Sequence, residues 1–128
     1  MRDLYSNIGT ALALAPAVQA AAVQGPAIDT LGFDSIAFTV STGAIVGDGD
    51  FGVKLQESDT TTGGDFTDAT AAVVKTNAPA TLAETSAYKL GYIGFKRYVR
   101  LAVTKAGGTS IAAGAVAVLG NAAQRPVA

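Results

Sequence analysis

The sequence predicts an all-β protein: an antiparallel β-sandwich, jelly-roll-like, with an extended N-terminal arm and a C-terminal tail. Several stretches alternate apolar and polar residues with a period of two, which is the pattern of half-buried strands. The chain has 15 glycines among its 128 residues. Glycine-rich turns separate short strands at spacings of eight to twelve residues, as in sandwiches and jelly rolls. The length suits a single domain with its own core.

We expect the arm over residues 1–26, the sandwich over 27–120 and the tail over 121–128. The run ALALAPAVQAAAV at 11–23 is apolar, but Pro16 and Gln19 interrupt it and it is too short to cross a bilayer. A signal peptide is the weaker alternative, because Asp3 offsets the positive charge of Arg2. We therefore interpret the run as an arm that anchors the domain to a partner.

Alternation and turn residues predict the strands in chain order. Residues 43–50 are expected as a turn-rich connection, and residues 81–85 as a short element of undefined type. The polar segment 59–65, with Gly63 and Gly64 at its tip, predicts a hairpin. Residues 88–93 and 97–104 are expected to pair across 94–96. The expected strands are 27–31, 35–40, 52–58, 66–69 with an extension through 72–75, 88–93, 97–104 and 109–119. A helix is the alternative over 109–119, because short apolar runs cannot be assigned by periodicity alone.

The segment YKLGYIGFKRYVRLAVT at 88–104 is the most informative part of the chain. One set of side chains, with Leu90 and Leu101 among them, is expected to face the core. The other set is aromatic and basic, and no acid lies in the segment. Tyrosine and arginine are enriched in protein interfaces. We favour an interface over the alternative, a solvated face on which basic side chains cover tyrosine rings.

Composition argues against catalysis. Histidine and cysteine are absent, so the most common general base, the thiol nucleophile and the usual zinc ligands are missing. We expect no enzyme activity, no metal and no cofactor. Asp48-Gly49-Asp50 resembles a fragment of a calcium loop, but the following residues lack the remaining ligands, and an acidic turn is the better interpretation. The carboxylate pairs Glu57/Asp59 and Asp65/Asp68 are better explained as solvated turn residues than as a glycosidase site.

Charge is strongly segregated along the chain, although the net charge is only −1. Residues 29–68 hold eight acids and one lysine, whereas residues from Thr85 onward hold six basic residues and no acid. Two interpretations stay open: the halves neutralise each other within one domain, or copies and partners meet acid to base. Nucleic-acid binding is not expected, because the chain has no surplus of positive charge.

The order of segments resembles a group of small virion structural proteins of tailed bacteriophages, which are often found among head genes. The resemblance spans nearly the whole chain, and its motifs carry no active site. The matching pieces are DLYSNIGTALAL, AIDTLGFDSIAFTVSTGAI, VKLQESDTTTGGDFTDAT, KLGYIGFKRYVRLAVT and the tail QRPV.

The resemblance implies a β-rich accessory protein that decorates or cements a capsid by binding major capsid proteins across capsomer boundaries. It also implies a homo-oligomer, with a trimer favoured, on the capsid surface of a virion made in the bacterial cytoplasm, without a membrane partner. The alternatives are a neck or tail subunit and a carbohydrate- or receptor-binding module. Exposed aromatics in 48–51 or 59–66 would favour the module, and burial of Phe51 and Phe66 would favour a scaffold.

The anchoring segments and the basic cluster supply the expected partner-binding residues. On this hypothesis, removal of residues 1–20 leaves a folded domain that no longer binds capsids. The expected residues are Arg2, Leu4, Tyr5, Leu12, Leu14, Lys96, Arg97, Arg100 and Arg125.

Overall fold

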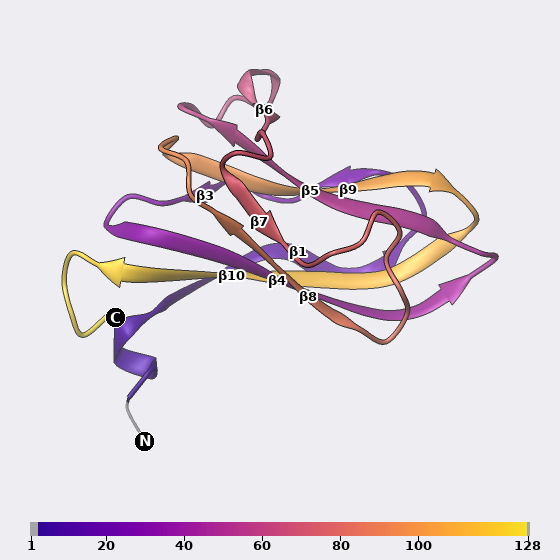
Figure 1. The fold of residues 1–128 in the computed structure, drawn as a ribbon, viewed down its shortest axis with the longest axis horizontal. Coiled ribbons are helices and arrows are strands. Elements are labelled where there is room, and N and C mark those ends of the chain that lie inside the picture. The colour runs from indigo at the N-terminus through magenta and orange to yellow at the C-terminus, as the bar shows by residue number, and fades with distance from the viewer. Residues whose placement is uncertain (1–2, 128) are drawn as a thin grey trace.

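A computed structural model describes residues 3–127 as two antiparallel sheets that enclose one core. The first sheet has the order β1-β10-β4-β8-β7, and the second has the order β2-β9-β5-β6, with β3 also paired to β9. Figure 1 shows β5 and β9 in one layer and β10, β4 and β8 in the other. The strands are β1 (Gly9–Gln19), β2 (Val23–Gln24), β3 (Ile28–Asp29), β4 (Phe33–Val46), β5 (Asp50–Ser58), β6 (Thr67–Asp68), β7 (Val74–Thr76), β8 (Ala87–Tyr92), β9 (Tyr98–Gly107) and β10 (Ser110–Ala122).

The pairing of the strands is nested, and this confirms the jelly-roll-like sandwich. Strand β1 pairs with β10, β2 with β9, β4 with β8 and β5 with β6, all of them antiparallel. The chain therefore folds like a hairpin that has been rolled up, which is the arrangement of a jelly roll. Two short 3₁₀ turns, η1 (Tyr5–Asn7) and η2 (Gly63–Asp65), are the other regular elements of the described chain.

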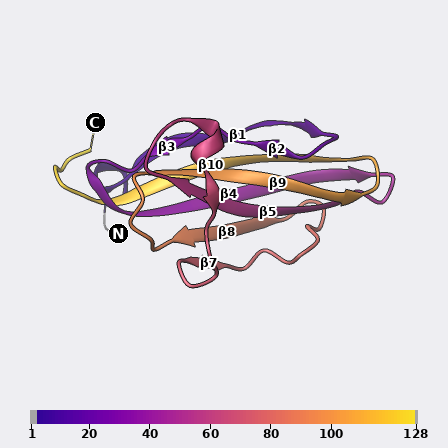
Figure 2. The same cartoon turned by 90° about the horizontal axis from the view of Figure 1, so that it is seen from above.

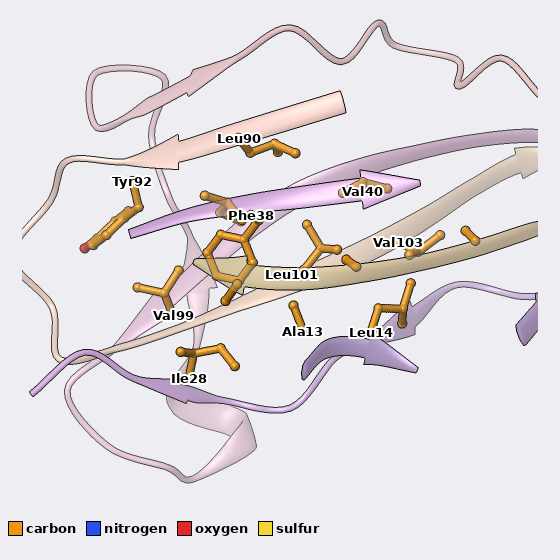
Figure 3. Packing of buried hydrophobic residues seen from close by; sticks show 14 of the residues in the cluster. Ala13, Leu14, Ile28, Phe38, Val40, Leu90, Tyr92, Val99, Leu101 and Val103 are labelled. Carbon is orange, nitrogen blue, oxygen red and sulfur yellow. The ribbon is translucent and has the colours of Figure 1, made fainter. Parts of the chain in front are cut away.

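The core lies between the sheets and comes from alternate residues of the long strands. Phe38, Leu90 and Val40 point into it from the first sheet, and Val99, Leu101 and Val103 point into it from the second (Figure 3). Phe38 and Leu101 are completely buried. The period of two in the sequence is thus the period with which side chains alternate between core and surface.

The N-terminal segment expected as an arm is part of the sandwich, which corrects the boundary at residue 27. Strand β1 pairs along its length with β10, and Ala13 and Leu14 are buried in the core. Pro16 is compatible with this because β1 is an edge strand, and the register shifts between Leu14 and Ala17 around the proline. Beyond β10, the tail is tied down by hydrogen bonds from Ala123 N–H to the Gly32 carbonyl and from Val127 N–H to the Ser6 carbonyl.

The structure corrects two expected neighbours among the strands. Strands β8 and β9 do not pair: β8 lies between β4 and β7, whereas β9 lies between β2 and β5 in the other sheet. Strands β6 and β7 likewise belong to different sheets, so residues 66–75 are not one strand. Alternation reports which face of a strand is buried, but it carries no information about the partner strand.

Other expectations for single elements are confirmed or extended. The hairpin at 59–65 connects β5 to β6. Residues 109–119 lie largely in β10, which pairs on both sides with β1 and β4, and the helical alternative is wrong. Strand β4 continues to Val46, so the turn after it is shorter than expected.

Candidate interaction surface

Both termini lie at one end of the sandwich, together with the β3–β4 loop and the β8–β9 connection. Figures 1 and 2 show the N- and C-terminal ends on the same side of the molecule. Residues 30–32 between β3 and β4 reach the tail through Gly32, and they reach the β8–β9 connection through a hydrogen bond from Thr30 N–H to the Arg97 carbonyl. The N-terminal segment joins them, since Gly9 packs closely against the ring of Phe33.

Large apolar side chains are exposed at this terminal end. Their exposed fractions range from 60% for Ile93 to 88% for Phe95. We call the set the apolar end surface; it comprises Leu4, Tyr5, Leu31, Ile93 and Phe95. A hollow of about 210 Å³ lies beside it, lined by residues of the two loops that include Phe33 and Phe95. Large exposed apolar side chains at one end of a domain make that end a candidate for protein binding.

Arg97 and Asp29 hold the two loops of this end together. The Arg97 Nε and Nη2 groups donate hydrogen bonds of 2.9 and 2.8 Å to the two carboxylate oxygens of Asp29. This bidentate pairing lowers the pKa of Asp29 to about 2, although desolvation opposes the shift. The guanidinium also lies over the Tyr98 ring, 5.1 Å from its centroid.

A second polar network centres on Tyr92. Its hydroxyl donates to the Glu57 carboxylate and accepts a hydrogen bond from Lys96 N–H at 3.1 Å. Burial, followed by the hydrogen bond to Glu57, raises the pKa of Tyr92 to about 12. The Lys96 ammonium lies 2.8 Å from Asp59, and that hydrogen bond raises the pKa of Lys96. The network links the β8–β9 connection to β5 and to the loop that follows it.

Arg100 is also engaged within the molecule. Its Nε donates a 2.7 Å hydrogen bond to Gln56, and its guanidinium lies 4.3 Å from the centroid of the Phe66 ring. The basic residues Lys96, Arg97 and Arg100 were predicted to meet acidic groups on neighbouring subunits. In the structure, two of them pair with acids of their own domain, and Arg100 contacts Gln56 and Phe66; their contacts with neighbouring subunits stay a prediction. Of the two interpretations of the charge segregation, neutralisation within the domain accounts for Lys96 and Arg97.

The remaining predicted residues lie in different places. Leu4 and Tyr5 are exposed at the terminal end, and Arg125 is exposed in the tail. Leu12 is exposed on the outer face of the first sheet, where it pairs with Val116. Leu14 is buried and cannot contact a partner in this conformation, which corrects that prediction. Arg2 lies outside the described residues.

Three members of the apolar end surface are not among the predicted partner-binding residues: Leu31 and Ile93 are expected from the sequence within strands 27–31 and 88–93, but β3 ends at Asp29 and β8 at Tyr92. Leu31, Ile93 and Phe95 stand next to Gly32 or Gly94, in segments that connect strands. A large apolar residue in a glycine-containing connection has no strand face on which to be buried. That signal could have identified all three residues.

Of the carboxylates considered for chemistry, Asp65 and Asp68 are held by other side chains. Asp68 accepts hydrogen bonds from Gln56 and Lys54, which lower its pKa, and Asp65 accepts one from Thr60. Across residues 3–127, no group of three or more acids could hold a metal ion. No helix in the described chain is long and apolar enough to cross a membrane.

Comparisons with known proteins identify a shared fold. The chain is similar to the crystal structure of the SPBc2 prophage-derived protein YomS, with a TM-score of 0.57 and 11% sequence identity. The match covers 92% of this chain and 98% of that protein. No protein-family model matches the sequence, and no curated protein matches it. At this identity the likeness establishes that the two chains share one β-sandwich fold over nearly their whole length.

Proposed function

We propose that this protein is a non-enzymatic structural component of a phage particle, which decorates or cements the capsid by binding major capsid proteins across capsomer boundaries. The observation that carries the proposal is the apolar end surface: five large, exposed apolar side chains at the terminal end of a jelly-roll sandwich. The full-length likeness to a prophage-derived protein supports a phage setting. Jelly rolls are common among viral capsid and lectin domains.

The chemistry of the terminal end suits protein binding. Tyr5 and Phe95 offer large contact areas at a low cost in side-chain entropy, and aromatic residues are enriched among the energetic centres of interfaces. The ion pairs Arg97–Asp29 and Lys96–Asp59 border this surface and supply polar groups for a rim. Because the same pairs fix the loops, binding requires little additional ordering.

The buried aromatics favour a scaffold over a carbohydrate-binding module. Phe51 is completely buried and Phe66 is 9% exposed, so neither ring is available to stack on a sugar. These rings belong to the two segments, 48–51 and 59–66, whose exposed aromatics would have favoured such a module. We therefore keep capsid binding as the proposed function.

The direct test is to locate the chain in particles. Particles are induced from the genome that carries the coding sequence, purified, and analysed by mass spectrometry and particle reconstruction. We expect density for the sandwich on the head, with the apolar end surface against the major capsid protein. Absence of the chain from purified particles contradicts the proposal. Density confined to the neck or tail contradicts it too, and supports the alternative of a neck or tail subunit.

A binding assay tests the surface itself. Heads that lack the protein are mixed with the purified chain, and bound protein is measured by co-sedimentation. We expect L31S and F95S to weaken binding at least tenfold, because truncation of a central aromatic or aliphatic anchor commonly costs more than about 1.4 kcal/mol. V18S is the matched control, since Val18 is 68% exposed but lies in β1, outside the apolar end surface. Equal loss in V18S contradicts the assignment of the surface.

A further inference from the structure

A groove with two lysines lies on the outer face of the first sheet, near its β7 edge. Its volume is about 350 Å³. Across the strands, Ala37 pairs with Gly91 and Gly91 with Lys75, while Thr39 pairs with Lys89 in the next row. The floor therefore has almost no side chains, and two ammonium groups stand beside it. We call it the lysine groove; it is lined by Ala37, Lys75, Thr76, Asn77, Lys89 and Gly91.

The two lysines differ from three other basic residues of the domain. Lys54, Lys96 and Arg97 each form an ion pair with an aspartate. Within residues 3–127, neither Lys75 nor Lys89 forms an ion pair, and both are exposed. Ion pairing among the described residues thus leaves Lys75 and Lys89 unneutralised, together with Arg100, Lys105 and Arg125.

The far end of the sandwich has the complementary chemistry. Val46 is 54% exposed at the end of β4, and Asp48 follows in the turn to β5. Glu84 is held beside them, since its carboxylate accepts a 3.5 Å hydrogen bond from Ile45 N–H. Asp48 and Glu84 form no ion pair within the described chain. We call Val46, Asp48 and Glu84 the acidic turn; the β4–β5 turn lies at the end of the molecule opposite the termini (Figure 1).

The groove and the acidic turn of one molecule cannot meet. Lys89 lies beside Thr39, whereas Glu84 lies beside Ile45, six residues further along β4. At the rise of an extended strand this separation is about 20 Å. Both features are fixed to the same sheet, so no side-chain rotation brings the charges together. Any contact between them has to come from two molecules.

We infer that copies of this chain associate end to side, with the acidic turn of one copy docked in the lysine groove of the next. Asp48 and Glu84 then face Lys75 and Lys89, and Val46 covers the small-residue floor of Ala37 and Gly91. The two surfaces differ, so the contact is heterologous, and it produces a closed ring or a filament. The inference does not depend on the proposed function, because it uses neither the apolar end surface nor a capsid.

Cross-linking tests the contact in the unmodified protein. A carbodiimide joins lysine amines directly to carboxylates that touch them, and mass spectrometry identifies the joined peptides. We expect links from Lys75 or Lys89 to Asp48 or Glu84. Lys89 and Glu84 lie beside β4 residues that are about 20 Å apart, so links that occur in cross-linked oligomers and not in the monomer band report contacts between copies. Their absence from cross-linked oligomers, or a chain that stays monomeric throughout a concentration series, overturns the inference.

Charge reversal tests the same contact by sedimentation velocity. We expect K75E/K89E to weaken self-association at least tenfold, because attractive pairs become repulsive. D48N/E84K should do the same; asparagine is used at Asp48 because its φ of 56° suits Asn but strains most other residues. Association of the unmodified chain should also weaken as salt rises.

The matched controls are R125E and D34K, which reverse exposed charges in the tail and in the β4 segment near the termini. We expect them to self-associate like the unmodified chain, and circular dichroism verifies that every variant is folded. Loss of association in the controls as well would mean that net charge, and not this contact, governs assembly, and it would overturn the inference.

Mixing the variants distinguishes this contact from other modes of assembly. K75E/K89E keeps an intact acidic turn, and D48N/E84K keeps an intact groove. A mixture should therefore form heterodimers through the two unmodified surfaces, whereas each variant alone stays monomeric; growth beyond the heterodimer relies on the contact with swapped charges, which is weaker because D48N leaves one of its charges out. Combining all four substitutions in one chain should restore part of the association. Failure of the mixture to form heterodimers overturns the inference even if both variants are monomeric alone.

Discussion

Single residues hold the loops of the terminal end in place, and their charge states set how the fold responds to pH. Asp29 and Arg97 lie 68 residues apart in the sequence and form a bidentate pair. Tyr92 connects β8 to β5 through Glu57 and to the following loop through Lys96 N–H. Neither pairing could be read from the sequence, because each joins segments that only the fold brings together.

We expect D29N to lower stability by less than about 1 kcal/mol, because the two side chains of the pair are 44% and 46% exposed and solvent screens them. The pKa of Asp29 is lowered in the folded state to about 2, so its contribution is present above the unfolded value of about 4 and is lost as pH falls from there toward 2. Chemical denaturation across this range measures the effect. D34N serves as the control, and an identical pH profile for D29N and the unmodified chain would contradict the assignment.

Ionisation of Tyr92 should lower the stability of the fold at high pH. Its pKa is raised to about 12, so its contribution to stability is complete below the unfolded value of about 10 and is lost as pH rises from 10 to 12. Phenolate absorbance is followed as pH rises in the unmodified chain and in Y92F. The difference between the two curves isolates the titration of Tyr92, and its midpoint is the pKa of that residue. We expect Y92F to lower the free energy of unfolding by about 1–3 kcal/mol, because it removes a hydrogen bond to a carboxylate in a half-buried network. A midpoint near 10 in the difference curve would contradict the raised pKa of Tyr92.

At the scale of elements, β1 is the clearest departure from the expectation. From the sequence, the run at 11–23 is interpreted as an arm because Pro16 and Gln19 interrupt it and it is too short to cross a bilayer. Small residues nevertheless suit a strand that packs against β10, itself rich in alanine, and Leu14 adds one large buried side chain. The segment therefore contributes to the core of the sandwich, and the predicted effect of removing residues 1–20 changes.

We expect a chain that lacks residues 1–20 to lose the cooperative unfolding transition, because the deletion uncovers β10 and removes Ala13 and Leu14 from the core. Removal of residues 1–4 alone should leave the transition close to that of the full chain, since β1 begins at Gly9. L14A should lower the free energy of unfolding by about 2–5 kcal/mol, because it truncates a buried side chain. Thermal denaturation followed by circular dichroism measures all three variants. A fully stable domain without residues 1–20 would restore the arm hypothesis.

Gly25 lies between β2 and β3, which both pair with β9, where the chain passes close to β1 of the other sheet. A Cβ atom at this position would lie 1.9 Å from the Ala13 carbonyl oxygen, which belongs to the backbone of β1. The backbone has to shift to admit it, so we expect G25A to destabilise the fold by more than about 2 kcal/mol. G64A is the control, because Gly64 has open space around it. Equal melting temperatures for the two variants would show that the chain around Gly25 and Ala13 is not tightly packed.

At the scale of the whole molecule, the nested pairing joins the two ends of the chain. Strand β1 pairs with β10, so the first and last strands must meet before the first sheet is complete. Contacts between residues distant in sequence slow folding. We therefore expect refolding in milliseconds to seconds, measured by stopped-flow fluorescence of the tyrosines. Complete refolding within microseconds would contradict this order of assembly.

The molecule also has two chemically different ends. The termini, the apolar end surface and two ion pairs lie at one end, and the acidic turn lies at the other. The proposed capsid contact uses the first end, and the inferred contact between copies uses the second together with a sheet face. A single chain can therefore make both contacts at once.

The sequence by itself determined the fold class, most strand positions and the core faces, because alternation with a period of two directly reflects the geometry of a half-buried strand. It also located the β5–β6 hairpin through its paired glycines. Only the tertiary structure decided which strands are neighbours, that β1 belongs to the sandwich, and which charges pair within the domain. Those outcomes depend on contacts between distant segments, such as Arg97 with Asp29, and local periodicity carries no information about them.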